Sequence, residues 1–411
     1  MNSTRSHVPS LLSALWFIVA ALTFISVALL MGVTALGAVL TGESIGPQQT
    51  IVMTASAFQA LIVLAAAFIS IQRFRQKPFA EQNSSLNLPA WQVAASLVVT
   101  SFVLAAGYWI AESDLAAWLF LPILTLPAVV LPLFVVLGLG VRGISLGTRW
   151  QSWNVFGLAM TLAPFILIFL EVFALILLVV IAVVMMMSQP GFESTIQQLA
   201  TQIAVLDPQS KEAQDLIAPY LLQPGVIAVS LLYLAVLVPL CEELLKPLGV
   251  WFFARSLSSP AQGFALGALS GAAYGLIETL GVSAQPTDWA FLLLTRVGTG
   301  MLHITSSAIM GAAIVYAVRE RRYFRLLGMY ALSVSLHAVW NTIAIFFAFA
   351  TISDYFQLEH FLRTWQLPLN IAMAVYAAIL CGILVWSNRK IRATLPVPVV
   401  DEALSLPNEQ P

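Results

Sequence analysis

Charged residues are scarce in this chain. They make up 9% of its 411 residues, against about a quarter in ordinary soluble domains, while hydrophobic residues make up 60%. So little charge excludes a soluble globular enzyme. It predicts an all-α, polytopic transmembrane helical bundle.

Cysteine is also rare, and one familiar catalytic signature is missing. The two cysteines, Cys241 and Cys381, both lie in apolar runs, which excludes a disulfide framework and a thiolate metal site. The sequence has no HExxH pair of the kind that binds zinc on one helix.

Long apolar runs are plentiful. About ten are long enough, at roughly 1.5 Å per helical residue, to cross a bilayer. They lie near residues 11–40, 51–71, 91–110, 117–141, 155–187, 226–254, 264–281, 291–318, 326–349 and 368–386. The first is too long for a signal-peptide core, so we expect it to be retained as a span. The Gly- and Ala-rich run at 264–281 should pack against neighbouring helices and not face lipid.

Basic residues fall mainly on one side of these runs. With the N-terminus inside, fourteen of the eighteen Lys and Arg residues lie in inside segments, and only Lys211 and Arg363 lie outside. Lys246 and Arg296 lie within spans. The bias predicts an even number of spans with both termini in the cytoplasm.

The chain divides into four predicted regions. Residues 1–187 form a five-span membrane region, 188–225 an extracytoplasmic amphipathic loop, 226–390 a second membrane domain, which carries the candidate site residues discussed below, and 391–411 a disordered, Pro-rich cytoplasmic tail. The loop has apolar residues at helical spacing, which predicts two short helices divided at Pro208. We interpret it as a connector on the headgroups, with a lid or substrate-docking element beside the site as the alternative.

Charge inside the spans is concentrated in the second half. Glu242, Glu243 and Lys246 lie in one otherwise apolar run, where each charge costs roughly 2.5–3.5 kcal/mol on insertion scales. Lys246 follows the glutamates by four and three residues. We expect it to neutralise one carboxylate and leave the other unpaired, which suits acid–base chemistry. The alternative is an ion pair that only holds helices together. Glu171, the one clear intramembrane charge of the first half, we interpret as a buried residue hydrogen-bonded to a neighbouring helix.

The next three runs each add polar residues, several of them four positions apart and so on one helical face. They are Tyr274 and Glu278, then Arg296, His303 and Ser307, then His337 and Asn341. Counting along the spans places Glu278 and Arg296 toward the outer end. We therefore expect these two to form an ion pair, with Glu278 orienting or gating the site.

Together these residue types can activate water. A carboxylate can take a proton from water, a histidine can donate to an oxyanion or protonate a leaving amine, and an asparagine can donate to developing negative charge. Alternatively, Glu243, His303 and His337 can hold Zn²⁺ with one position open for water. Ser307 we interpret as a packing residue.

The motifs resemble one known family when they are taken in order. E-E-x-x-K at 242–246, aromatic-x-x-x-E at 274–278, Arg296 followed by His303, and L-H-x-x-W-N at 336–341 look like the PrsW family of intramembrane proteases. That family resembles, more distantly, the CAAX-prenyl endopeptidase and bacteriocin-processing superfamily. The resemblance covers about residues 226–350, and the first five spans have no counterpart in it.

The resemblance implies peptide-bond hydrolysis in or at the edge of a bacterial plasma membrane, by a glutamate-type or a metal-dependent mechanism. It implies that the paired glutamates activate water and that Zn²⁺ is the cofactor if the enzyme is metallo-type. Tyr274 stands where the family often has Phe, which we expect to matter little. Ser307 stands where an acidic residue is common, which weakens a metal-ligand role there.

We therefore expect an intramembrane protease. The expected catalytic residues are Glu242, Glu243, His303, His337 and Asn341, and the supporting ones are Lys246, Glu278 and Arg296. The expected partners are a membrane-protein substrate and the lipid bilayer, with no nucleic acid. A proton-coupled transporter using the same Glu and His residues as a relay stays open as an alternative, as does an inactive scaffold. A transporter is expected to have matching discontinuous helices in both halves, and the first half lacks comparable polar sites.

Overall fold

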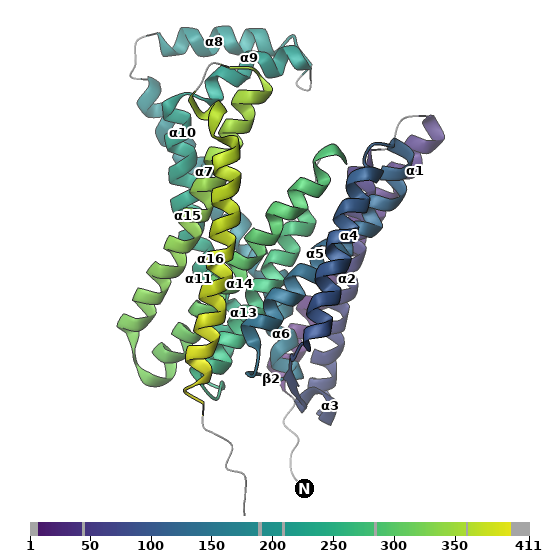
Figure 1. Cartoon of the computed structure of the whole chain (residues 1–411), viewed down its shortest axis with the longest axis vertical. Coiled ribbons are helices and arrows are strands. Elements are labelled where there is room, and N and C mark those ends of the chain that lie inside the picture. Colours follow the sequence, from purple (N-terminus) through teal and green to yellow (C-terminus); the bar gives the residue numbers. More distant parts are fainter. Residues whose placement is uncertain are drawn as a thin grey trace, which may run out of the picture.

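The chain folds as a bundle of long helices (Figure 1). The computed structural model describes residues 7–42, 46–187, 191–207, 210–282, 286–358 and 361–395. Within these residues, ten helices are long and apolar enough to cross a membrane. They are Val8–Thr41, Pro47–Phe74, Ala90–Ile110, Asp114–Val141, Arg149–Met185, Pro224–Phe253, Pro260–Gly281, Trp289–Glu320, Tyr323–Tyr355 and Phe361–Arg392. Each contains or overlaps one predicted run, which confirms the all-α membrane fold; the orientation of the termini remains a prediction.

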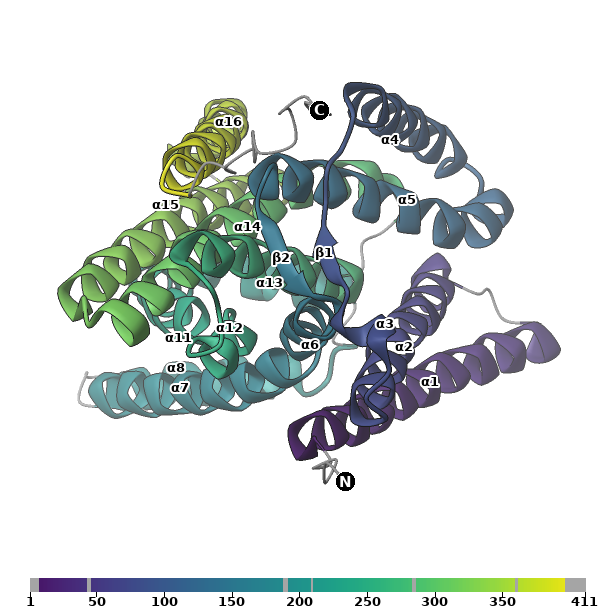
Figure 2. The same cartoon turned by 90° about the horizontal axis from the view of Figure 1, so that it is seen from below.

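The first half builds five spans and one small sheet. Its elements are α1 (Val8–Thr41), α2 (Pro47–Phe74), α3 (Pro78–Glu81), β1 (Asn83–Ser85), α4 (Ala90–Ile110), α5 (Asp114–Val141), β2 (Ser145–Thr148), α6 (Arg149–Met160) and α7 (Leu162–Met187). The antiparallel pair β1–β2 lies at the end of the bundle seen in Figure 2. Thr148 then starts α6 through a capping box with Gln151, which satisfies backbone donors at the start of the helix.

The second half builds the other five spans. Its elements are α8 (Phe192–Ile203), α9 (Lys211–Leu221), α10 (Pro224–Ser230), η1 (Leu231–Leu237), α11 (Val238–Leu245), α12 (Leu248–Phe253), α13 (Pro260–Gly281), η2 (Pro286–Asp288), α14 (Trp289–Glu320), α15 (Tyr323–Tyr355), η3 (Phe361–Trp365) and α16 (Gln366–Arg392). The sixth span is therefore broken into four short pieces, α10, η1, α11 and α12.

Helices α13 and α14 form the centre of the bundle. In each, 89% of the most apolar stretch is buried within the protein. Small residues allow this packing: a β-carbon at Gly263, Gly267 or Gly271 would collide with the backbone of α14. The prediction that the Gly- and Ala-rich run packs against helices is confirmed. The close approach also brings His303 on α14 next to α13.

The two membrane regions share one hydrophobic core. Its buried residues extend from Ile51 to Ile391, and α13 contacts both α5 and α6 from the first half. Gly249 of α12 packs against Val155 of α6. The division into regions 1–187 and 226–390 remains a prediction, and the two regions are packed together.

The connecting loop contains the two expected short helices, α8 and α9. In Figure 1, α8 lies across the spans at the end of the bundle opposite the sheet. Pro208, the predicted divider, lies outside the described residues, as do residues 396–411 of the predicted tail. Whether the loop is a connector or a lid remains a prediction.

Candidate active site

The sixth span is broken at two prolines, and both breaks serve the site. In the π-helical turn η1, Val238 N–H bonds to the carbonyl of Tyr233, five residues back. The next residue, Pro239, has no N–H, so the carbonyl of Leu234 lacks its helical partner. Asn341 on α15 supplies one, because its Nδ2 donates to Leu234 O at 2.7 Å. A π-helical turn in an otherwise α-helical span is common at functional sites.

The second break lies at Pro247, between α11 and α12. The carbonyl of Lys246, at the end of α11, accepts a hydrogen bond from Ser270 Oγ of α13 at 2.6 Å. This contact ties the end of α11 to the central helix. The paired glutamates and Lys246 are thereby presented to α13, α14 and α15.

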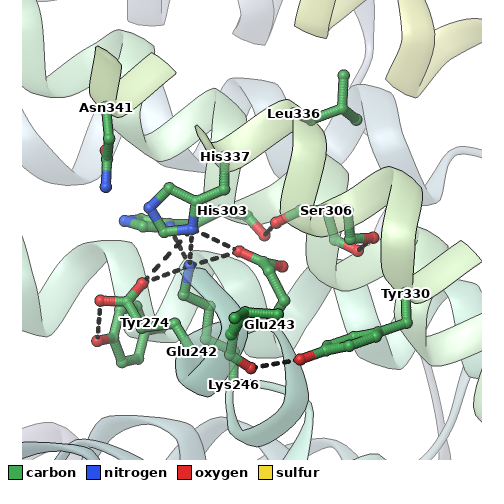
Figure 3. Close-up of polar contacts among 12 residues, drawn as sticks. Glu242, Glu243, Lys246, Tyr274, His303, Ser306, Tyr330, Leu336, His337 and Asn341 are labelled. Atoms are coloured by element: carbon green, nitrogen blue, oxygen red, sulfur yellow. Dashed lines mark hydrogen bonds and ion pairs between the residues drawn. The ribbon is translucent and has the colours of Figure 1, made fainter. Parts of the chain in front are cut away.

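The ammonium group of Lys246 is the centre of the site (Figure 3). The side chain is fully buried. Nζ lies 2.7 Å from Glu242 Oε2, 2.8 Å from Glu243 Oε1, 2.8 Å from His303 Nδ1 and 3.3 Å from His337 Nδ1. The expectation that Lys246 pairs with one carboxylate and leaves the other unpaired is therefore wrong. Positions i+3 and i+4 are both within reach on one helical face, and the flexible lysine lies between them.

The two glutamates have different surroundings. Glu243 is completely buried and is absent from the lining of the adjoining cavity, whereas Glu242 is 7% exposed and lines it. Glu242 Oε1 also accepts a hydrogen bond from the Tyr274 hydroxyl at 3.1 Å. Phenylalanine has no hydroxyl to make this contact; our expectation that tyrosine in place of phenylalanine matters little remains a prediction.

His303 is held from both sides. Its Nδ1 accepts from Lys246, which can only donate, so the ring proton is on Nε2. Nε2 then donates to Glu278 Oε2 at 2.5 Å. Glu278 Oε1 in turn pairs with Arg296 at 2.8 Å. The expected ion pair is confirmed, and Glu278 contacts the constellation directly through His303.

His337 is oriented by the buried glutamate. Its Nδ1 donates to Glu243 Oε1 at 2.8 Å, a shorter distance than the 3.3 Å to Lys246. Nε2 has no hydrogen bond to another described residue and is left available, and His337 lines the cavity. A carboxylate that fixes the tautomer and direction of a histidine is a recurring arrangement in hydrolases.

A cavity of about 580 Å³ opens beside these groups. That volume lies within the range of ligand sites. Glu242, Glu278, Arg296, His303 and His337 contribute to its walls, together with aromatic residues. A buried polar cluster bordering a cavity can bind a substrate segment and water.

One cavity residue comes from the first half and was missed as a site residue. Glu171 on α7 lines the cavity, and its side chain forms no hydrogen bond or ion pair with a described residue. Only its backbone carbonyl is bonded, to the Tyr233 hydroxyl at 3.0 Å. The expectation of a side-chain hydrogen bond to a neighbouring helix is therefore wrong. An isolated charge in an apolar run was the only available signal.

Ser307 takes no part in the cluster. It is buried, and its hydroxyl has no hydrogen-bond partner among the described residues. Its backbone carbonyl faces Gly267 in the tight α13–α14 contact. This placement agrees with a packing role.

Comparison with protein families decides the affiliation. A family model described as PrsW family intramembrane metalloprotease matches residues 147–380. The chain belongs to the PrsW family. Searches of curated proteins and of solved structures gave no match. The PrsW match begins at residue 147, so it extends beyond the range 226–350 suggested by the motifs and includes α6 and α7. The expectation that none of the first five spans has a counterpart in the family is therefore wrong for the fifth. The match identifies the chain as a peptidase, and with ten candidate spans the protein is an integral, multi-pass membrane protease.

The PrsW description as a metalloprotease raises the question of metal binding. Glu242, Glu243 and His337 offer ligand atoms that all lie within 4.8 Å of one another. The sequence predicted Glu243, His303 and His337 as the zinc ligands. In the structure, Glu242 joins Glu243 and His337 in this group and His303 does not. The space between these atoms is filled by Lys246 Nζ, which makes close contacts with both carboxylates. An ammonium group and a divalent cation compete for the same oxygens, so this arrangement does not fit a metal ion while Lys246 stays in place.

Proposed function

We propose that this protein hydrolyses peptide bonds of membrane-associated protein substrates in the 580 Å³ cavity, with Glu242 as the general base. The observation that carries the proposal is the asymmetry of the paired glutamates. Glu242 lines the cavity, whereas Glu243 is sealed behind it and bonds to His337. A general base must reach the water from which it takes a proton.

In the proposed reaction, Glu242 takes a proton from water as the water oxygen bonds to the peptide carbonyl carbon. The proton then passes to the amide nitrogen as the C–N bond breaks, giving a carboxylic acid and an amine. His337, with Nε2 available, is placed to relay this proton to the leaving amine or, once protonated, to donate to the oxyanion.

The remaining residues hold this pair in place. Lys246 offsets the charge of both carboxylates, and the Glu278–His303 contact holds Lys246 from the other side. His303 has both ring nitrogens engaged, so we assign it a positioning role and not proton transfer to the leaving amine. Asn341 likewise supports Leu234 of the π-helical turn, in place of the expected oxyanion contact.

Cleavage by purified protein in liposomes tests the proposal. Single-span membrane proteins are supplied as substrates, and new termini are identified by mass spectrometry. Glu242→Gln is expected to slow cleavage by about 10²–10⁴-fold, the usual contribution of a general base. The matched control is Glu320→Gln, which removes a carboxylate from an ion pair with Arg322 outside the site.

Equal cleavage by wild type and Glu242→Gln would contradict the assignment of the base. Cleavage by no form, together with proton-coupled uptake that the same substitution abolishes, would support the transporter alternative. Membrane-protein cleavage by wild type and the control, lost in Glu242→Gln, is the result that we expect. We also propose that the protein lies in a bacterial plasma membrane.

A further inference from the structure

Three arginines meet at the end of the bundle where α5 and α16 terminate. Arg142 follows the last residue of α5, and Arg389 and Arg392 lie in the last turn of α16. They line a cavity of about 370 Å³, which contains no acidic residue in its walls. None of the three side chains forms an ion pair or hydrogen bond with another described residue. Figure 2 looks onto this end and shows α16 beside α5.

The walls of this cavity are fixed by the packing of the two helices. Asn388 is buried, and its Nδ2 donates to the carbonyls of Gly140 at 2.8 Å and Arg142 at 3.2 Å. The chain turns at Gly143, which has φ +72°, and the Arg392 side chain packs against it. These contacts hold the ends of α5 and α16 together. The three arginines are exposed, and the packing of the two helices places them around one cavity.

Like charges held together repel one another unless an anion lies between them. The two helix C-termini provide only about half a negative charge each, which offsets roughly one of three arginines. Arginine also presents a planar fork of donors that matches phosphate oxygens. The cavity therefore has the charge and the donors to bind a phosphate group.

A second cavity adjoins the other face of the same helix end. It has a volume of about 330 Å³ and is lined by Arg325 and Lys390 along with apolar residues that include Phe264, Met329 and Trp386. No acidic residue lines it. The Lys390 ammonium group lies over the Trp386 ring, with Nζ 5.0 Å from the ring centroid. Exposed tryptophan with basic residues is typical of the membrane interface, where lipid phosphates lie.

We propose that Arg142, Arg389 and Arg392 form a binding site for a phosphate group, and that an anionic phospholipid of the predicted cytoplasmic leaflet supplies it. The second cavity, which has largely apolar walls beside Arg325 and Lys390 at the same end of the bundle, favours a lipid over free phosphate. Basic pockets between spans at a cytoplasmic surface are suited to anionic headgroups. The site lies at the opposite end of α16 from η3 and is independent of the proteolytic cavity.

Native mass spectrometry of delipidated full-length protein in detergent tests this site. Phosphatidylglycerol and phosphatidylcholine are titrated separately, and inorganic phosphate is tested by its effect on the melting temperature. The variant is Arg142→Gln/Arg389→Gln/Arg392→Gln. The control removes three exposed cations of the same predicted side, Arg75→Gln/Lys77→Gln/Arg255→Gln. Arg389→Gln alone serves if the triple variant fails to fold.

We expect phosphatidylglycerol to bind wild type and the control more tightly than phosphatidylcholine. At roughly fivefold for each cation near an anionic surface, the triple variant should bind phosphatidylglycerol about 100-fold more weakly and Arg389→Gln about fivefold more weakly. A wild-type melting shift with inorganic phosphate, absent in the variant, would assign the site to a soluble phosphate. Undiminished phosphatidylglycerol binding by the variant, or an equal loss in the control, would overturn the proposal.

Discussion

Replacement of Lys246 by methionine tests whether one ammonium group holds the site together. Its Nζ lies 2.7 Å from Glu242 and 2.8 Å from Glu243, and the side chain is fully buried. Methionine retains a long, flexible side chain but leaves both carboxylates without their shared cation. Removal of one partner of a buried ion pair costs about 3–5 kcal/mol. We expect the free energy of unfolding to fall by about this amount and cleavage to be lost.

Unfolding in mild detergent, followed by tryptophan fluorescence, measures the effect. Glu243→Gln in the same background removes one of the uncompensated charges, so the double variant should be less destabilised than the sum of the single variants by about 1–3 kcal/mol. The control is Arg322→Met, which breaks an exposed ion pair with Glu320 and should cost less than about 1 kcal/mol. Lys246→Met no more destabilising than this control, or simple additivity with Glu243→Gln, would refute the reasoning.

Four further substitutions, at three positions, test individual contacts. Lys246→Ala removes the ammonium group and leaves the carboxylate and imidazole atoms free to bind a metal. We expect elemental analysis to find about one Zn²⁺ per chain in this variant and none in wild type. A variant without zinc would count against competition between the ammonium group and a metal. Tyr274→Phe removes a hydrogen bond to Glu242 and should lower kcat/KM by about 10–100-fold, the equivalent of about 1.5–3 kcal/mol. An unchanged kcat/KM would show that the contact is unimportant. In Asn341→Asp and Asn341→Ala, the side chain can no longer donate a hydrogen bond to Leu234 O, so each should lower the free energy of unfolding by about 1–3 kcal/mol. An aspartate variant as stable as wild type would contradict the assignment of this contact as the partner of the Leu234 carbonyl.

Much of the fold follows from the sequence because the membrane limits the choices. Long apolar runs become helices, and all ten predicted runs correspond to candidate spans. The small residues of α13 predicted a helix that packs closely against its neighbours, and Gly271 shows why, since it lies against the backbone of His303. The same logic located the cluster of Glu242, Glu243 and Lys246, because charge is too costly in lipid to be placed without a use.

The different roles of the site residues could not be predicted from the sequence and depend on the three-dimensional structure. Helical spacing puts both glutamates within reach of Lys246 but cannot say which one faces a cavity. Asn341 donates to the Leu234 carbonyl the hydrogen bond that Pro239 cannot donate. Asn341 is about a hundred positions from both residues, so no local pattern reveals this contact. Glu171 reaches the cavity only because α7 packs against the sixth span, a contact that hydropathy does not encode.

The cleavage rate of chelator-treated wild type, compared with Glu242→Gln, tests the central claim most directly. The rate is measured in liposomes under single-turnover conditions, before and after exhaustive chelation, and again after zinc is added. The account predicts an unchanged rate after chelation and a loss of at least about 100-fold in Glu242→Gln. A rate that collapses on chelation and returns with zinc, with Glu242→Gln still active, would contradict it.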